Sequence, residues 1–356
     1  MSVLERQDRL VGWLGTCDLT AILVTELANI RYLTGYVGTN AVALIAPERR
    51  LLFTDSRYIV SAKEQTSGVD VVLAGRDLIE QVGKAMGEIG GPIGIEADDM
   101  TLGRRDRFAA AAPNVELRPV ADAVENLRLA KSAEEIARIR AATEIADVAF
   151  DWVAAQNLVG MTERDVAWEL EGILRREGAD GPSFPIIVAA GVNGARPHAV
   201  PSASPIPAGT LVVVDMGALL DGYHSDCTRT YATGPLPEAL SHVYEVCLAA
   251  ERAAVAAVAP GITCGALDEV ARGMIRDAGF GDAFGHGLGH GVGLHIHERP
   301  WVRPGGAEVL SAGMAITVEP GIYLEGVGGV RIEDLVIVTQ GGGEVLTKHP
   351  RELATY

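Results

Sequence analysis

The chain has 356 residues, enough for two domains, because a single hydrophobic core rarely grows beyond about 250–300 residues. Its hydrophobic content of 48% is that of a globular protein, and its formal net charge of −17 leaves no basic excess for binding phosphates. These properties argue against nucleic acid and anionic membranes as partners. No apolar run reaches the roughly 18–20 residues of a membrane span, and the charged start predicts no secretory signal.

The first third of the chain predicts a domain of alternating strands and helices. Strands are predicted over residues 21–24, 41–46, 50–55 and 92–97, with a helix over 76–90. Few polar residues cluster in this part. A break near residues 126–131 places the end of the domain near residue 128.

A second domain follows, with long helices between strands. Ser132 and Glu135 have the spacing of a capping box at the start of a helix. Further helices are predicted over residues 162–178, 237–259 and 264–278. Strands are predicted over residues 185–190, 211–216, 223–230, 290–297, 314–319 and 330–338. Every conspicuous polar cluster lies on or beside these strands, so we expect the chemistry in this domain.

Two aspartates lie on a predicted hairpin. Asp221 and Gly222 form a two-residue turn signal between apolar runs. In this register Gly217 faces Asp226, and Asp215 points to the same side as Gly217. Asp215 and Asp226 are then diagonal neighbours, about 7–8 Å apart at the backbone. A divalent cation would neutralise the pair; separate arginine or lysine partners are the alternative.

Two glutamates occupy unusual positions near the C-terminus. Glu319 ends an apolar strand directly before Pro320, and Glu333 interrupts the apolar pattern of residues 330–338. A glutamate in such a strand is almost never buried without a partner. A cation is one candidate partner, and Arg331, which shares the parity of Glu333, is the other.

The segment HGLGHGVGLHIHE, residues 286–298, holds four of the eight histidines and four glycines. Regular strand alternation would send His290 and His297 to opposite faces. A bulge or turn at the glycines would bring both to one site. Together with the acidic residues, one histidine gives an oxygen-rich donor set that suits two divalent ions such as Mn²⁺, Co²⁺, Fe²⁺ or Zn²⁺. Two such ions, about 3.5–4 Å apart, can hold a bridging hydroxide.

The order and spacing of VVVDMGALLDGYHSD, HGLGHGVGLHIHE, TVEPGIY and GGVRIEDLVIV resemble the pita-bread metallopeptidases, which include methionine aminopeptidase, aminopeptidase P and prolidase. The segments NIRYLTGYVGTNAVALI and FTDSRY resemble the N-terminal domain of prolidase, aminopeptidase P and creatinase, which methionine aminopeptidase lacks. The resemblance covers nearly the whole chain. It implies an α/β N-terminal domain over residues 1–128 and an α+β pita-bread catalytic domain over residues 129–356.

The resemblance also implies roles for individual residues. The implied metal ligands are Asp215, Asp226, His290, Glu319 and Glu333, with Asp226 and Glu333 bridging the ions. The implied catalytic and substrate-side residues are His198, His286, His297, Glu319 and Arg331. Among them, His297 contacts the scissile amide or its tetrahedral intermediate and Glu319 relays a proton. His295 receives no role.

One position departs from the family pattern. In prolidases, the HE pair is followed by one variable residue, a proline and an arginine. This arginine helps to hold the substrate carboxylate. Here the run is HERPWV, with Trp301 at that position and Arg299 and Arg303 nearby. We therefore assign Trp301 to substrate binding, and cleavage of peptides longer than dipeptides remains open.

The resulting hypothesis is a two-metal aminopeptidase or dipeptidase that cuts Xaa-Pro peptides by attack of a metal-bridging hydroxide. Mn²⁺ is the expected metal, with Co²⁺, Zn²⁺ or Fe²⁺ as alternatives, and the resemblance implies a homodimer. Four cysteines without CxxC spacing indicate reduced thiols and a cytoplasmic protein. The alternatives are a hydrolase of the same fold that acts on a non-peptide amide, and a non-catalytic binding protein.

Overall fold

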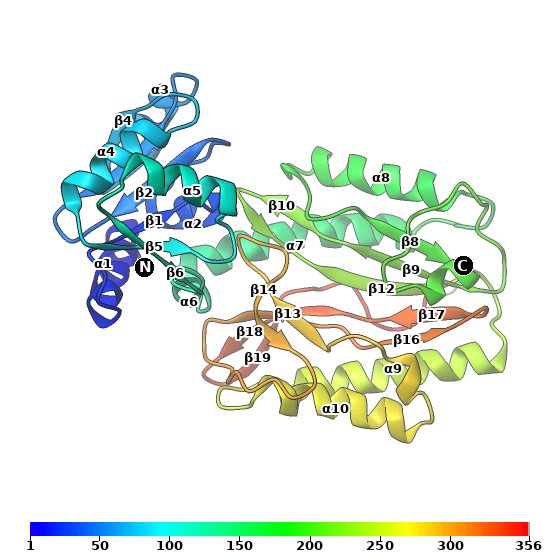
Figure 1. Ribbon diagram of the computed structural model, residues 1–356. Helices are drawn as coiled ribbons and strands as arrows, with labels where there is room; N and C mark the ends of the chain where they lie inside the picture. The colour runs from blue at the N-terminus through cyan, green and yellow to red at the C-terminus, as the bar shows by residue number, and fades with distance from the viewer. Residues whose placement is uncertain (355–356) are drawn as a thin grey trace. The chain divides into compact units, whose positions relative to one another are not determined.

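The computed structural model describes residues 1–354 and divides into two compact units, Met1–Arg128 and the part from Leu129 onward (Figure 1). Within the described residues, no helix is both long and apolar enough to span a lipid bilayer.

The first unit is built on one six-stranded mixed sheet, with the strand order β4-β3-β2-β1-β5-β6. Its strands are β1 (Ala21–Val24), β2 (Ala41–Ile45), β3 (Arg50–Thr54), β4 (Asp70–Leu73), β5 (Pro92–Glu96) and β6 (Glu116–Val120). Its helices are α1 (Val3–Thr16), α2 (Leu27–Thr34), α3 (Ile59–Gln65), α4 (Ile79–Ile89), α5 (Leu102–Ala111) and α6 (Glu125–Arg128). The predicted strands and the predicted helix are confirmed. Strands β4 and β6 were not predicted, because they are the edge strands and are half exposed, so they lack a strong apolar signal.

The second unit contains four long helices that cover two main sheets. The helices are α7 (Ala133–Ala154), α8 (Glu163–Arg176), α9 (Glu238–Ala257) and α10 (Cys264–Asp277), with short 3₁₀ turns over Gly191–Ala195 and Gly281–Ala283. The predicted capping box of α7 is present in both directions between Ser132 and Glu135. The mixture of helices and antiparallel sheets confirms the predicted α+β class.

One three-stranded sheet (β12-β9-β8) and one five-stranded sheet (β14-β13-β15-β18-β19) form the centre of the unit, and β11-β10-β7 and β16-β17 extend them. The strands are β7 (Gly181–Pro182), β8 (Ile187–Ala190), β9 (Leu211–Met216), β10 (Ala218–Leu220), β11 (Tyr223–His224), β12 (Cys227–Ala232), β13 (Gly289–Gly291), β14 (Glu298–Val302), β15 (Ala315–Val318), β16 (Gly321–Leu324), β17 (Gly328–Arg331), β18 (Asp334–Thr339) and β19 (Gly342–Val345).

Each of the two main sheets packs one face against a pair of helices. Helices α7 and α8 share a hydrophobic core with β8, β9 and β12, whereas α9 and α10 share another with β15 and β18 (Figure 1). The polar clusters lie on the strands between these two helical layers. The fold therefore brings together segments that are about a hundred residues apart in sequence.

Three strand predictions were wrong in extent. The predicted strand 290–297 is a strand only over Gly289–Gly291, and the next strand, β14, begins at Glu298. The predicted strands 223–230 and 330–338 are each interrupted, at residues 225–226 and 332–333. Each interruption contains a predicted metal ligand, Asp226 or Glu333. The hairpin register is the same on both sides of Asp226, whereas the chain changes sheets at Glu333.

Candidate metal centre

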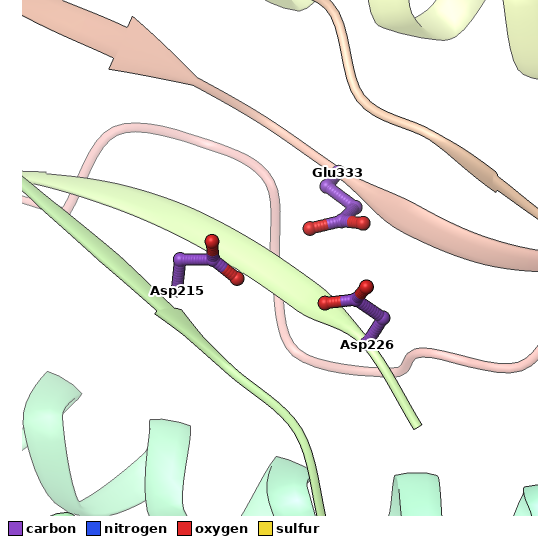
Figure 2. Close-up of side chains that lie close together, drawn as sticks. All are labelled: Asp215, Asp226 and Glu333. Atoms are coloured by element: carbon purple, nitrogen blue, oxygen red, sulfur yellow. The ribbon is translucent and has the colours of Figure 1, made fainter. Parts of the chain in front are cut away.

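The β9–β12 hairpin places its two aspartates as predicted. Leu220 pairs with Tyr223, and the same register continues to Thr228, which pairs with Asp215. Asp215, Asp226 and Glu333 each offer a carboxylate oxygen within 4.8 Å of the other two. Figure 2 shows the three carboxylates pointing into one space from three different segments.

The histidine segment reaches the same place through an irregular strand. A register shift follows His290, and the segment beyond Gly291 leaves the sheet. The rings of His290 and His297 thereby meet at 4.5 Å between centroids, although their parity is opposite. The predicted bulge is confirmed. Glycine is needed in β13, because a Cβ at Gly289 would lie 2.1 Å from the carbonyl oxygen of Thr317.

His290 completes the cluster with Glu319. The His290 Nε2 lies 3.3 Å from a Glu319 carboxylate oxygen and 3.6 Å from one of Asp226. The other ring nitrogen, Nδ1, lies 3.0 Å from the carbonyl oxygen of Gly291. This second contact orients the ring so that Nε2 faces the carboxylates, as in many histidine ligands of metals. All five predicted ligands are therefore brought together.

The cluster carries more buried negative charge than its protein partners neutralise. Burial, together with repulsion from Glu333 and Asp215, raises the pKa of Asp226 well above its usual value. Burial also raises the pKa of Glu333 well above its usual value, with repulsion from Glu319 as the next cause. The hydrogen bond and charge of His290 outweigh burial at Glu319 and lower its pKa to about 2. Such a group of carboxylates calls for a cation.

Two buried carboxylate oxygens without a hydrogen-bond partner indicate where a cation would bind. Asp215 Oδ1 and Glu333 Oε1 are buried without a hydrogen-bond partner. Arg331 binds Asp215 at 2.5 Å through the other oxygen, Oδ2, so the alternative of an Arg331–Glu333 pair is wrong. The other Glu333 oxygen accepts a hydrogen bond from Thr228 at 2.7 Å. The donor set of carboxylates and one imidazole fits divalent ions of the first transition row.

The candidate residues share one cavity of about 490 Å³. The five proposed ligands line it, and so do the other five predicted site residues: His198, His286, His297, Trp301 and Arg331. Trp301 lies on β14 directly opposite His290. The structure thus places every sequence-predicted residue at a single site. His295 does not line this cavity.

A hydrogen-bonded link between cavity residues was not predicted from the sequence. The Tyr323 hydroxyl accepts a hydrogen bond from Arg331 at 2.8 Å and lies 3.0 Å from Nε2 of His286. His286 is therefore connected through Tyr323 and Arg331 to Asp215. Tyr323 belongs to the TVEPGIY segment, but nothing in the local pattern indicates that its hydroxyl is used.

The apolar wall of the cavity was also missed. It comes from residues 184–187, which end at the first residue of β8, and from the loop that carries His198. It consists of Phe184, Pro185, Ile187, Pro197, Ala199 and Val200. Apolar residues beside a strand gave no signal that distinguishes them from core residues.

Comparison with known proteins agrees with this geometry. Residues 137–340 match the metallopeptidase family M24, and residues 6–130 match the creatinase/prolidase N-terminal domain. An Xaa-Pro dipeptidase of Pyrococcus furiosus is 37% identical over 98% of this chain and 99% of its own.

Solved structures with the same fold include an Xaa-Pro dipeptidase from Bacillus anthracis, 39% identical, with a TM-score of 0.97 over 100% of both chains. They also include an X-Pro aminopeptidase from Thermotoga maritima, 35% identical, with a TM-score of 0.90 over 99% of this chain and 100% of the other. The predicted pita-bread architecture is confirmed. The protein belongs to metallopeptidase family M24, whose members use divalent metal ions, and carries the N-terminal domain of creatinase and prolidase.

Proposed function

We propose that the protein is a two-metal Xaa-Pro peptidase, which removes the residue that precedes proline at the N-terminus of a peptide. One observation carries the proposal: three buried carboxylates, those of Asp215, Asp226 and Glu333, converge with His290 and Glu319 in one cavity. Relatives that are named Xaa-Pro dipeptidases and match nearly the whole chain support the substrate class.

The five residues just named would hold the divalent ions. When bound, the ions would polarise the scissile carbonyl and lower the pKa of the attacking water. The link from Arg331 to Asp215 would hold one ligand in place while leaving its Oδ1 free.

His297 is proposed to stabilise the transition state. Burial, and next the neighbouring His290, lower the pKa of His297, so its imidazole is neutral at neutral pH. A neutral imidazole carries one N–H, which can donate to the oxygen of the scissile carbonyl as negative charge develops there. The position of His297 against His290 aims it at the metal centre.

Glu319 is proposed to move the proton. Its carboxylate lines the cavity and lies 3.3 Å from Nε2 of His290, beside the other proposed ligands. It can accept a proton from the attacking water and return it to the proline nitrogen as the C–N bond breaks. The nitrogen of an Xaa-Pro bond carries no hydrogen, so this proton completes the secondary amine of the product.

The remaining assignments complete the proposal. His198, His286, Arg331 and Trp301 contact the substrate or orient the ligands, and the apolar wall receives the proline ring. Residues 1–128 form the N-terminal domain and residues 129–356 the catalytic domain. Manganese, a homodimer and a cytoplasmic location are proposed from the donor set, the family resemblance and the free cysteines.

A small peptide panel tests the reaction class. With added Mn²⁺, the protein should hydrolyse Ala-Pro and leave Ala-Ala largely intact, because the proposed apolar wall would bury a proline ring and gain less from an alanine side chain. Hydrolysis would be measured as released alanine. Turnover of a non-peptide amide without turnover of any Xaa-Pro peptide would favour the first alternative. Metal binding without any hydrolysis would favour a binding protein.

Substrate length depends on the cation near Trp301. A dipeptide places its carboxylate beside the site, and a buried unpaired carboxylate costs several kcal/mol. Arg299 is already bound to Glu308 at 2.7 Å, whereas Arg303 lines the cavity. We expect kcat/KM for Ala-Pro-Ala to equal or exceed that for Ala-Pro, since Trp301 offers no charge to a terminal carboxylate.

Two variants check this expectation. Trp301→Arg should shift the preference toward Ala-Pro, and Arg303→Ala serves as the comparison. If the unaltered protein cleaves Ala-Pro but not Ala-Pro-Ala, the expectation is wrong and the carboxylate clamp lies elsewhere. Loss of that activity in Arg303→Ala would then identify Arg303 as the clamp.

A further inference from the structure

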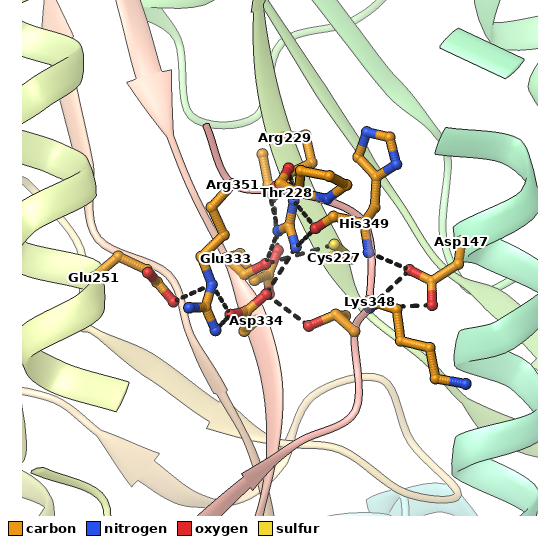
Figure 3. Close-up of polar contacts among 12 residues, drawn as sticks. Asp147, Cys227, Thr228, Arg229, Glu251, Glu333, Asp334, Lys348, His349 and Arg351 are labelled. Carbon is orange, nitrogen blue, oxygen red and sulfur yellow. Dashed lines mark hydrogen bonds and ion pairs between the residues drawn. The ribbon is translucent and has the colours of Figure 1, made fainter. Parts of the chain in front are cut away.

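A buried polar network lies behind Glu333, on the side away from the cavity. It joins the β12 segment Cys227–Arg229 to the C-terminal segment 348–350 (Figure 3). These two segments are about 120 residues apart in sequence. None of the steps proposed for catalysis uses this network, although it touches a proposed metal ligand.

Three consecutive residues of β12 hold Glu333. The backbone N–H of Glu333 donates to the carbonyl oxygen of Thr228 at 3.1 Å, and its carboxylate Oε2 accepts from the Thr228 hydroxyl at 2.7 Å. Its carbonyl oxygen accepts from Arg229 Nη1 at 2.5 Å and lies 3.5 Å from Cys227 Sγ. Only the carboxylate Oε1 has no partner. The residue is thus fixed at every polar group except the one left for a cation.

All three guanidinium nitrogens of Arg229 donate hydrogen bonds within this network. Besides Glu333, Arg229 donates to the carbonyl oxygens of Thr228 at 3.0 Å, His349 at 2.7 Å and Pro350 at 3.1 Å. It also forms an ion pair with Asp334 at 2.8 Å, and both side chains are almost completely buried. A planar guanidinium can satisfy several fixed acceptors at once, which the single nitrogen of a lysine cannot do.

The C-terminal segment is itself anchored from outside the metal centre. Asp147 on α7 accepts hydrogen bonds from the backbone N–H groups of Lys348 and His349 at 3.1 Å. The His349 ring stacks on Phe150, also on α7, at 5.6 Å. Helix α7 therefore fixes the carbonyl groups that receive Arg229.

We propose that Arg229 is a positioning residue for Glu333, and that segment 348–350 holds Arg229 in the orientation that this task requires. The inference rests on the proposed metal centre and extends it to the end of the described chain. It assigns the C-terminal segment an influence on metal affinity, although no residue of that segment lines the cavity.

The test compares two arginines that share one partner. Arg229 and Arg351 both bind the Asp334 carboxylate, but only Arg229 reaches the carbonyl group of Glu333. Arg229→Lys and Arg351→Lys each keep one positive charge beside Asp334. Mn²⁺ affinity would be measured by titrating the metal-stripped full chain, with circular dichroism and thermal unfolding as controls for folding.

We expect Arg229→Lys to weaken Mn²⁺ binding by about 10–100-fold, the usual cost of losing a group that orients a ligand. Arg351→Lys should lower thermal stability and leave Mn²⁺ affinity at the level of the unaltered protein. Mn²⁺ affinity in Arg229→Lys at the level of the unaltered protein would overturn the inference. So would equal losses in both variants, because the effect would then follow stability alone.

A milder change decides the matter if Arg229→Lys does not fold. Asp147→Ala removes the backbone hydrogen bonds that tie Lys348 and His349 to α7, leaves the contacts of His349 with Phe150 and Asp151, and does not touch Arg229 or any proposed ligand. It should weaken Mn²⁺ binding in the same direction by a smaller factor. Unaltered affinity in this variant would overturn the inference. If the unaltered protein binds no divalent ion, the proposed metal centre itself fails, which distinguishes the two results.

Discussion

Glu333→Gln should lower the activity by on the order of 10³-fold. A metal ion supplies several kcal/mol of transition-state stabilisation, and each 1.36 kcal/mol corresponds to a tenfold change in rate. Glutamine keeps the shape and can still accept the Thr228 hydrogen bond, but it lacks the charge that a bridging ligand supplies. Asp226→Asn should behave similarly. Metal content after dialysis, measured by atomic emission, should fall in both variants.

A matched control comes from an acidic residue outside the cavity. Glu308 is bound to Arg299 at 2.7 Å and does not line the site. Glu308→Gln should leave the metal content unchanged. Wild-type metal content in Glu333→Gln and Asp226→Asn would show that neither carboxylate is a ligand.

His297→Ala should separate chemistry from metal binding. Losing one donor to a developing oxyanion typically costs about 10²–10³-fold in rate. Both kcat and kcat/KM should therefore fall together, while metal content stays that of the unaltered protein. The kinetics would be measured with Ala-Pro at saturating Mn²⁺.

The opposite outcome would change the assignment of the two histidines. His290 and His297 lie in ring contact, and only geometry distinguishes the proposed ligand from the proposed donor. If His297→Ala loses its metal while kcat per bound metal is preserved, His297 is a ligand.

The local parts of the site could be predicted from the sequence because they obey simple periodicity. The Asp221-Gly222 turn defines the register, and the two-residue repeat of a strand then places Asp215 and Asp226 on one face. The parity conflict between His290 and His297 likewise required an irregular strand, and the register shift after His290 supplies it. At both places the local sequence pattern was enough to predict which side chains meet.

The network behind Glu333 could not be predicted in this way. Arg229 is separated from Glu333 by 104 residues and from His349 by 120, and no periodic pattern links segments so far apart. The interruption of the predicted strand 330–338 could not be predicted either, for a related reason. Apolar alternation continues across Ile332, whereas the backbone leaves the ladder there to bring Glu333 onto Thr228. Tertiary contacts outweigh local propensity at both places.

Ala-Pro hydrolysis by the metal-stripped protein decides whether the reaction depends on the proposed metal centre. The five converging ligands predict no turnover after thorough chelation, and recovery on addition of Mn²⁺ that saturates near two ions per chain. Circular dichroism would verify that the stripped protein remains folded. Full turnover in a sample that contains no measurable divalent metal would contradict the account.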